Sequence, residues 1–356
     1  MCSQSTQRVP KIIRSILVLL ALCLFGGPAI SYWYARSAIR EVEKHGGTVA
    51  GTGNTPVWLD GWLSKPVRRA LLTDWMIEEA VLGDLSRGYD YTWLHTLRRC
   101  SRLERLEIQT LSNAAVHEIP QDLPLRELSV KHARLDDDGW RALGNWSQLR
   151  LLDIENADLG ESGLQGVRRL RHLRSLSLST CVLSRDGLRP LTRLHSLRFL
   201  SLVDTPLGQI NSGQISQLTG LVELNLAGTA ITDAGIDGLG AFRRLETLNL
   251  TDTQVTLNGL FQHGRLPRLK NLSLDRTPAG DTSGAVLQRA VHLEHLSLNG
   301  TSIGDRIVDD LIQLKSLNRL SVLNTRLTED GIERIKVALP DCELHYGEDL
   351  YWDAND

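Results

Sequence analysis

The chain has 356 residues, enough for several ordinary domains or for one long solenoid. Its 40 lysines and arginines nearly balance 42 aspartates and glutamates, and the net charge of -2 excludes a general nucleic-acid binder. Aromatic residues make up only 5% of the chain while leucine is abundant, so the core must consist mainly of aliphatic side chains. This composition favours a repeat protein.

The amino-terminal segment is expected to enter a membrane. A short tail, residues 1–11, precedes a predicted transmembrane signal anchor at 12–35, in which residues 16–35 carry no charge. Twenty residues at a rise of about 1.5 Å cover the roughly 30 Å hydrocarbon core of a bilayer. Tyr32, Trp33 and Tyr34 would form an aromatic belt at one interface. The sequence therefore predicts a single-pass membrane protein.

A cleaved signal peptide is the alternative for this segment. The run from Ile16 to Phe25 has the length of a signal-peptide core, and Ala29 and Ser31 offer small residues for cleavage. We favour the uncleaved anchor because the apolar stretch continues through the aromatic belt. Flanking cations balance, so orientation rests on the tendency of long domains to be translocated whatever the flanking charge. We expect an exported repeat domain, periplasmic or at the cell surface, and a secreted one if cleavage occurs.

Two further segments precede the repeats. Residues 36–56 are predicted to be a linker, because KHGGTVAGTGNTP (44–56) is rich in glycine and small polar residues. Residues 57–102 suit an amino-terminal cap that covers the open end of a solenoid. They hold four of the eight tryptophans, Trp58, Trp62, Trp75 and Trp93. A carbohydrate-binding role for these rings is the less favoured alternative.

A repeat of 24 residues dominates the rest of the chain. The pattern LxxLxL begins at Leu125, Leu149, Leu173, Leu197, Leu221, Leu245, Leu269, Leu293 and Leu317, with an earlier copy at Leu103. Within each unit the first half alternates apolar and polar residues, which predicts a short half-buried strand. In the second half, as at Ile236, Leu239 and Phe242, apolar residues three apart predict a short helix.

Ten such repeats over residues 103–341 predict an α/β solenoid. A single unit cannot bury its apolar face, so strands must stack beside strands and helices beside helices. Helices are wider than strands, which places a parallel sheet on the concave face and the helices on the convex face. Asp233 is expected to cap its helix, and residues 342–356 to form a closing strand and a tail.

The repeat pattern resembles a known family. LxxLxLxxTxITDxGLxxLxxLxx, nearly complete from Leu221 to Arg244, is similar to the leucine-rich repeats of the ribonuclease-inhibitor-like class, which also occur in F-box adaptors. With its charged start, apolar span and the segments RSAIREVEKHGGTV and VALPDCEL, the chain resembles bacterial membrane-anchored leucine-rich repeat proteins. The resemblance implies a horseshoe fold and protein–protein interaction, and it brings no catalytic residue.

The ninth position of each repeat is expected to stabilise the turn that leaves the strand. In the family a side chain there bonds to backbone groups, and a threonine hydroxyl can do the same. The predicted structural ladder consists of Cys181, Thr205, Thr229, Thr253, Thr277, Thr301 and Thr325. Ala133 and Ala157 occupy this position earlier and make no such bond, so we expect looser first turns held by water, Asn156 or Thr180.

No enzyme motif is present in the sequence. HExxH, GxSxG, phosphate-loop and clustered His or Cys patterns are all missing, so we expect no catalytic activity, cofactor or metal. Asp136 to Asp138 are expected to cap a helix rather than bind calcium, and His292 and His295 to belong to a turn and a strand. The five cysteines are far apart, so a disulfide among Cys100, Cys181 and Cys342 stays open.

Specificity is expected on the outward positions of the strands, which the scaffold fixes in place. Apolar side chains at Leu151, Phe199 and Val203 stand out there as a candidate anchor for a partner, or as drift on an unselected surface. The polar candidates around them are Glu155, Asp204, Glu223, Asp252, Arg276, His295 and Arg319.

The leading hypothesis is a membrane-tethered module that binds a protein or peptide, with no nucleic-acid or small-molecule ligand. A structural or envelope-organising protein and an F-box-like adaptor without a visible F-box are the alternatives.

Overall fold

The computed structural model describes residues 38–51, 77–86, 90–160, 163–184, 187–207, 214, 217–236, 238–262, 266–281, 287 and 289–348. The predicted anchor, residues 12–35, lies outside the described residues, as do Trp58, Trp62 and Trp75 of the predicted cap. Within the described ranges, no helix has the length and apolar character needed to cross a membrane.

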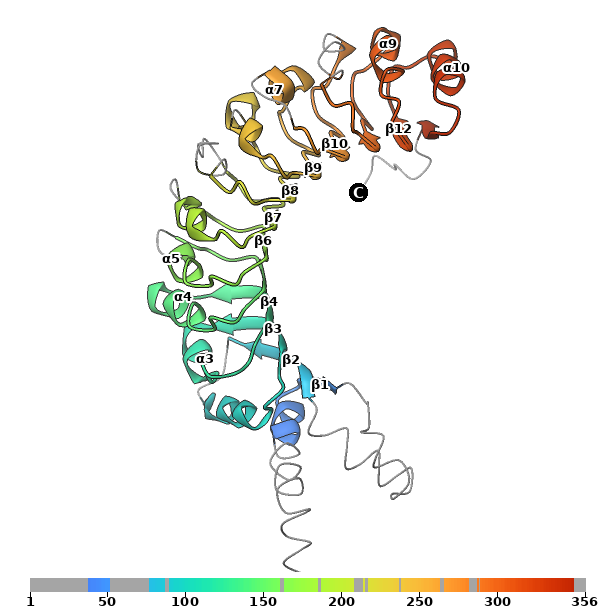
Figure 1. The fold of residues 1–356 in the computed structure, drawn as a ribbon. Coiled ribbons are helices and arrows are strands. Elements are labelled where there is room, and N and C mark those ends of the chain that lie inside the picture. Colours follow the sequence, from blue (N-terminus) through green and yellow to red (C-terminus); the bar gives the residue numbers. More distant parts are fainter. Residues whose placement is uncertain are drawn as a thin grey trace, which may run out of the picture.

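The described strands form one sheet whose spatial order follows the chain order. They are β1 (Thr48–Gly51), β2 (Ile77–Leu85), β3 (Arg105–Ser112), β4 (Glu127–Arg134), β5 (Leu151–Glu155), β6 (Ser175–Ser179), β7 (Phe199–Ser201), β8 (Glu223–Asn225), β9 (Thr247–Asn249), β10 (Asn271–Ser273), β11 (His295–Ser297), β12 (Arg319–Leu323) and β13 (Glu343–Gly347). From β2 onward the pairing is parallel. From β4 onward, residues 24 apart face each other, as Leu248 faces Leu272, whereas the offset is 26 between β2 and β3 and 22 between β3 and β4. The sheet lines the inner side of a curved solenoid (Figure 1).

Helical segments form the outer side of the solenoid (Figure 1). They are η2 (Thr92–Arg99), α3 (Asn113–Glu118), α4 (Asp137–Leu143), α5 (Gly163–Val167), η3 (Arg189–Arg193), η4 (Asp233–Ile236), η5 (Leu239–Ala241), α7 (Leu257–Gln262), η7 (Asp305–Ile307), α9 (Val308–Leu311) and α10 (Glu329–Ala338). In the repeats that begin at Leu173 and Leu221, the described helical half consists of short 3-10 turns.

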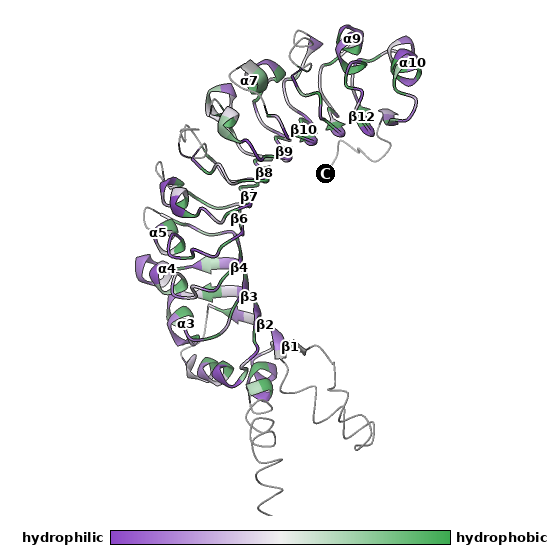
Figure 2. Ribbon diagram, viewed as in Figure 1, coloured by the Kyte–Doolittle hydropathy of each residue, from purple (hydrophilic) through white to green (hydrophobic). Residues whose placement is uncertain are grey.

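The core lies between these two layers. In the repeat that begins at Leu221, the residues Leu221, Leu224 and Leu226 are each fully buried, and Ile236 and Phe242 meet them from the helical side. Apolar and polar residues therefore alternate along the repeats (Figure 2). Each such aliphatic side chain contributes roughly 1.5–3 kcal/mol before chain entropy is subtracted. The leucine periodicity in the sequence is thus the periodicity of the core.

The amino-terminal end corrects the predicted linker. Residues 38–44 are helical, with Ala38 and Val42 buried, and β1 pairs antiparallel with β2. Gly47 permits this close approach, since a Cβ there would lie 2.6 Å from the carbonyl oxygen of Val81. The described part of the predicted linker therefore belongs to the folded end of the solenoid. The parallel sheet also begins at β2, before the first predicted repeat at residue 103.

The first turns are also different from the expectation. β3 and β4 are eight residues long, and Ala133 continues the ladder by pairing with Leu111. A residue inside a strand needs no side-chain bond to hold a turn, so the alanine is tolerated there. The turn expected at Ala133 is therefore replaced by strand, whereas Ala157 lies two residues beyond the end of β5. Asn156 does donate to the carbonyl of Lys131 at 3.4 Å.

Candidate functional site

The apolar candidates lie on the concave sheet close to one another. Leu151 of β5 and Phe199 of β7 are both in register with Ser175 of β6. Because neighbouring strands are about 4.8 Å apart, the backbone positions of the two residues lie about 10 Å from each other. Phe199 is 44% exposed and Leu151 is half-buried. Val203, also half-buried, lies two residues beyond the end of β7. We call Leu151, Phe199 and Val203 the apolar ridge.

Two acidic candidates border the apolar ridge. Glu223, the first residue of β8, is in register with Phe199 and exposed. Glu155 ends β5 and is half-buried. The structure therefore brings an exposed aromatic ring, two aliphatic side chains and two carboxylates together on strands β5 to β8.

His295 and Arg319 lie farther along the concave face and already have partners. Nδ1 of His295 is 2.7 Å from Oδ1 of Asn271, whose amide donates to Oγ1 of Thr247 at 3.0 Å. Arg319 donates to the carboxylate of Glu343 at 2.8 Å. These side chains line an open hollow of about 350 Å³ over β9 to β12. The hollow lies two strands or more from the apolar ridge, so the two are separate features of the concave face.

The remaining three candidates are not on strands. Asp204, Asp252 and Arg276 have φ angles of 52°, 56° and 54°, and they form the turns that leave β7, β9 and β10. Arg276 donates from Nε to Oδ1 of Asp252 at 2.6 Å and also from Nη2 to Oδ2, which raises the pKa of the Arg276 guanidinium. Their assignment to the concave binding surface is therefore corrected: they are turn residues at its rim.

A sequence signal for these turns was available. The eighth position of successive repeats holds Asn156, Thr180, Asp204, Gly228, Asp252, Arg276, Gly300 and Asn324, all with positive φ. Glycine, asparagine and aspartate are the residues that best tolerate this left-handed conformation. Their recurrence one position before the threonines marks a turn rather than a binding row.

The threonine ladder is built from local bonds. Oγ1 of Thr229 donates to the carbonyl of Leu226 at 2.6 Å, three residues earlier. The same bond recurs in Thr253, Thr277, Thr301 and Thr325. Thr205 differs, because it donates to the carbonyl of Leu178 in the preceding repeat at 2.7 Å and accepts from the amide of Cys181. The hydroxyls therefore satisfy buried carbonyls at the strand ends, mostly within one repeat.

Cys181 belongs to this buried layer. Its Sγ lies 3.5 Å from the carbonyl oxygen of Ile154 and 3.4 Å from that of Ser179. Burial raises the pKa of the thiol to about 11, so it stays protonated at neutral pH. A protonated, enclosed thiol is a poor nucleophile. Cys100, Cys181 and Cys342 are all free thiols.

Asp233 has a different role from the predicted helix cap. Its carboxylate accepts from the amide and the hydroxyl of Thr256 in the next repeat, both at 2.7 Å. Asp305 accepts in the same way from Thr328, at 2.9 and 2.7 Å. These aspartates therefore join successive repeats. Asp136, in contrast, does cap α4, accepting from the amides of Asp138 and Gly139.

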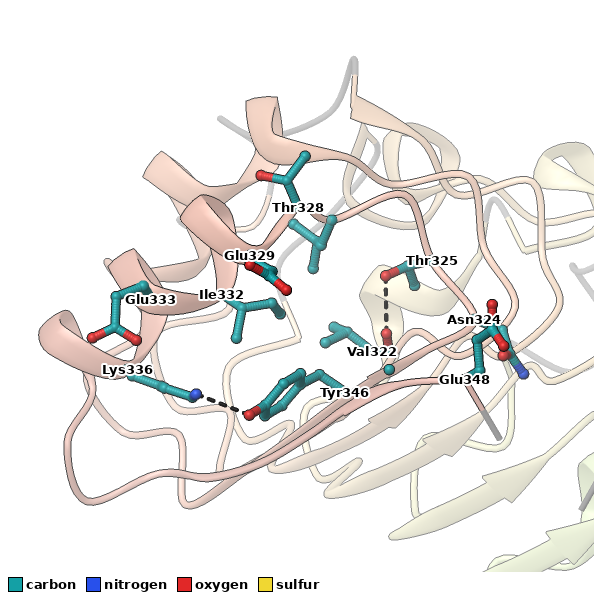
Figure 3. A pocket seen from close by; sticks show the side chains of 12 residues that line it. Val322, Asn324, Thr325, Thr328, Glu329, Ile332, Glu333, Lys336, Tyr346 and Glu348 are labelled. Atoms are coloured by element: carbon teal, nitrogen blue, oxygen red, sulfur yellow. Dashed lines mark hydrogen bonds between the residues drawn. The ribbon is translucent and has the colours of Figure 1, made fainter. Parts of the chain in front are cut away.

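A second hollow opens at the carboxyl-terminal end of the solenoid (Figure 3). It has a volume of about 810 Å³ and lies between α10 and the strands β12 and β13. Nζ of Lys336 donates to the Tyr346 hydroxyl at 2.9 Å and lies 4.5 Å from the ring centroid. This bond raises the pKa of Lys336. Across the described ranges, no group of three or more His, Cys, Asp or Glu residues is placed to hold a metal.

Comparisons with known proteins address the fold. A family model described as a leucine-rich repeat matches residues 218–240. An internalin from Listeria monocytogenes has a similar structure, with a TM-score of 0.54 and 18% identity over 77% of this chain and 87% of that one. The chain folds as a leucine-rich repeat protein. Internalin C2 of the same species matches with a TM-score of 0.44 and 22% identity, covering 52% of this chain and 75% of its own. No curated protein sequence matches this chain.

Proposed function

We propose that this leucine-rich repeat protein is a membrane-tethered module that binds a protein or peptide on its concave face. The observation that carries the proposal is Phe199, an aromatic ring 44% exposed and two strands from Leu151 on the parallel sheet. Exposed aromatic side chains on a fixed surface are typical anchors of protein interfaces. The scaffold lowers the entropy lost on binding, because the strand backbone is already ordered.

The proposed tether rests on the sequence. Residues 12–35 have the length and apolar character of a single span, and we infer that the repeats are exported. Protease treatment of intact cells tests this arrangement. Digestion of the repeats before lysis supports export to the surface, digestion only after outer-membrane permeabilisation supports a periplasmic location, and protection until full lysis contradicts both.

We also propose that the module works by binding alone. Burial raises the pKa of Cys181, the cysteine in the threonine ladder, to about 11, and its thiol contacts the carbonyls of Ile154 and Ser179 rather than a histidine. His295 is engaged with Asn271 rather than beside a nucleophile. Neither arrangement supports acid–base or nucleophilic chemistry.

The binding proposal is tested by placing charge on the apolar ridge. We expect the double variant Phe199→Asp, Val203→Asp to lose crosslinked partners from native membranes, because two carboxylates would have to be buried in the interface. A matched control is Val291→Asp, Val337→Asp, since these valines are 52% and 74% exposed and lie off the strands. Retention of the same partners at the same yield by the first variant would show the ridge to be unimportant.

A further inference from the structure

Three arginines form a row at the edge where the strands begin. Arg150, Arg174 and Arg198 directly precede β5, β6 and β7. The amide of Arg174 donates to the carbonyl of Arg150 at 2.8 Å, and the amide of Arg198 to the carbonyl of Arg174 at 2.8 Å. Three cations therefore branch from neighbouring backbone positions about 4.8 Å apart. Like charges at this spacing repel one another.

The same position is neutralised in other repeats. Arg126 pairs with Glu104 at 3.2 Å, and Lys270 pairs with Glu246 at 3.7 Å and with Glu294 at 3.8 Å. Charges of opposite sign alternate there. Within the described residues, the side chains of Arg150, Arg174 and Arg198 have no carboxylate partner; Arg198 bonds only to the carbonyls of His195 and Leu197.

The neighbouring turns add to this charge. Residues 163–175 and 187–198, which lead into β6 and β7, contain seven arginines and no aspartate or glutamate. Arg168, Arg171 and Arg193 are among them, and all three are exposed. We call the row and these turns the arginine edge. In a chain with a net charge of -2, this edge is a strongly positive region that lacks internal counterions among the described residues.

We propose that the arginine edge binds a carboxylate-rich segment of the protein partner, next to the apolar ridge. Arg150 is followed by Leu151 and Arg198 by Phe199, so the positive row lies directly beside the ridge where β5 and β7 begin. One partner segment can therefore place an apolar side chain on the ridge and its acidic residues on the edge. This inference rests on the proposed protein-binding function and adds the charge of the partner.

The composition of the edge favours carboxylates held in fixed geometry. Its cations are all arginine, and a guanidinium binds a carboxylate through two parallel hydrogen bonds, whereas diffuse attraction to a membrane needs only charge. Between residues 163 and 199, Phe199 is the only Trp, Tyr or Phe, whereas sites for single-stranded nucleic acid stack successive bases on several rings. An acidic protein segment therefore fits the edge better than lipid or nucleic acid.

The test uses the full chain in detergent and a fluorescent oligoglutamate peptide that carries one phenylalanine. We expect this peptide to bind more tightly than its glutamine counterpart, and more weakly as salt rises. The variant Arg150→Gln, Arg174→Gln, Arg193→Gln removes three cations whose side chains make no hydrogen bond in the described structure. We expect it to weaken binding by about tenfold, since each exposed ion pair contributes modestly.

The control variant is Arg134→Gln, Arg306→Gln, Arg326→Gln, which removes the same charge from exposed arginines outside the edge. We expect its affinity to stay within about twofold of wild type. Equal binding of the two peptides, or equal losses in the two variants, would overturn the inference. So would tighter binding of an oligonucleotide or of phosphatidylglycerol vesicles than of the peptide. If the arginine variant keeps its native partners while Phe199→Asp, Val203→Asp loses them, the concave-face proposal stands without this inference.

Discussion

Among the turn residues with positive φ, Thr180 is the one whose side chain fits this backbone conformation least well. Its φ is 54°, it is exposed, and a β-branched residue is strained in this conformation. We predict that Thr180→Asn raises the free energy of unfolding by about 1 kcal/mol, because asparagine tolerates the left-handed region. Urea unfolding measures the change. Thr180→Val keeps the branching and should give no gain; an equal gain in both variants would contradict this explanation.

The cysteines differ in how easily they ionise. Burial raises the pKa of Cys100 and of Cys181 to about 11, while Cys342 is only partly buried. In a Cys2→Ser, Cys23→Ser background we predict that a thiol reagent at pH 8 modifies Cys342 first and the other two only on unfolding. Mass spectrometry after timed labelling measures this order. Rapid modification of Cys181 in the native state would mean that the core is open there.

At the residue scale, the sequence predicted a role best where the side chain can do only one thing at its position. Threonine at the ninth position could be placed at the strand ends because its hydroxyl can satisfy a carbonyl there. The positions of Asp252 and Arg276 were predicted wrongly, because their charge suggested a binding role. The type of side chain did not show that their backbone has a positive φ angle. Gly228 and Gly300 occupy the same repeat position, and glycine there indicates a positive φ angle.

At the scale of elements, α4 and α5 touch through glycine. A Cβ on Gly166 would lie 1.9 Å from the carbonyl oxygen of Trp140, which is backbone and cannot move aside cheaply. We predict that Gly166→Ala costs about 1–3 kcal/mol of unfolding free energy, as overpacked sites do. Gly83→Ala is the control, since the nearest atom would be 3.7 Å away. Thermal unfolding of both variants decides the matter; equal melting temperatures would show that the helices separate easily.

The contact between Asp305 and Thr328 joins the last repeats and depends on pH. Hydrogen bonds from Thr328 lower the pKa of Asp305 below its usual value, so the ionised form stabilises the fold. This stabilisation is present above the unfolded-state pKa of about 3.9 and is lost as the pH falls through the lower folded-state pKa. We predict that Asp305→Asn has a flatter dependence of melting temperature on pH below about 4. Asp341→Asn, an exposed carboxylate with no bond in the described structure, is the control and should keep the wild-type slope.

The elements were predictable where the repeat is regular and not where it begins. The strands from β5 to β12 lie where the leucine pattern puts them, since each needs only its own alternation of apolar and polar residues. β1 has no such repeat to identify it, and its glycine-rich sequence was interpreted as a linker. Its strand forms because β2 offers an unpaired edge, which is a tertiary effect that local sequence does not contain.

At the scale of the whole molecule, the period of 24 determines one continuous core and leaves the outward positions free. Sequence alone therefore gave the horseshoe and its concave sheet, and it also identified Leu151, Phe199 and Val203 as unusual. It did not identify the arginine edge. Arg150, Arg174 and Arg198 are unusual only because the charged residues at the same position in other repeats form ion pairs, and those pairs are visible only in the structure.

The central claim is that partners bind the concave face at the apolar ridge. A photo-crosslinking phenylalanine analogue introduced in place of Phe199 in the native host tests it directly, with the same analogue at Val337 on α10 as the control. The account predicts a discrete crosslinked protein from position 199 and none from position 337. Crosslinking from position 337 without any from position 199 would contradict it.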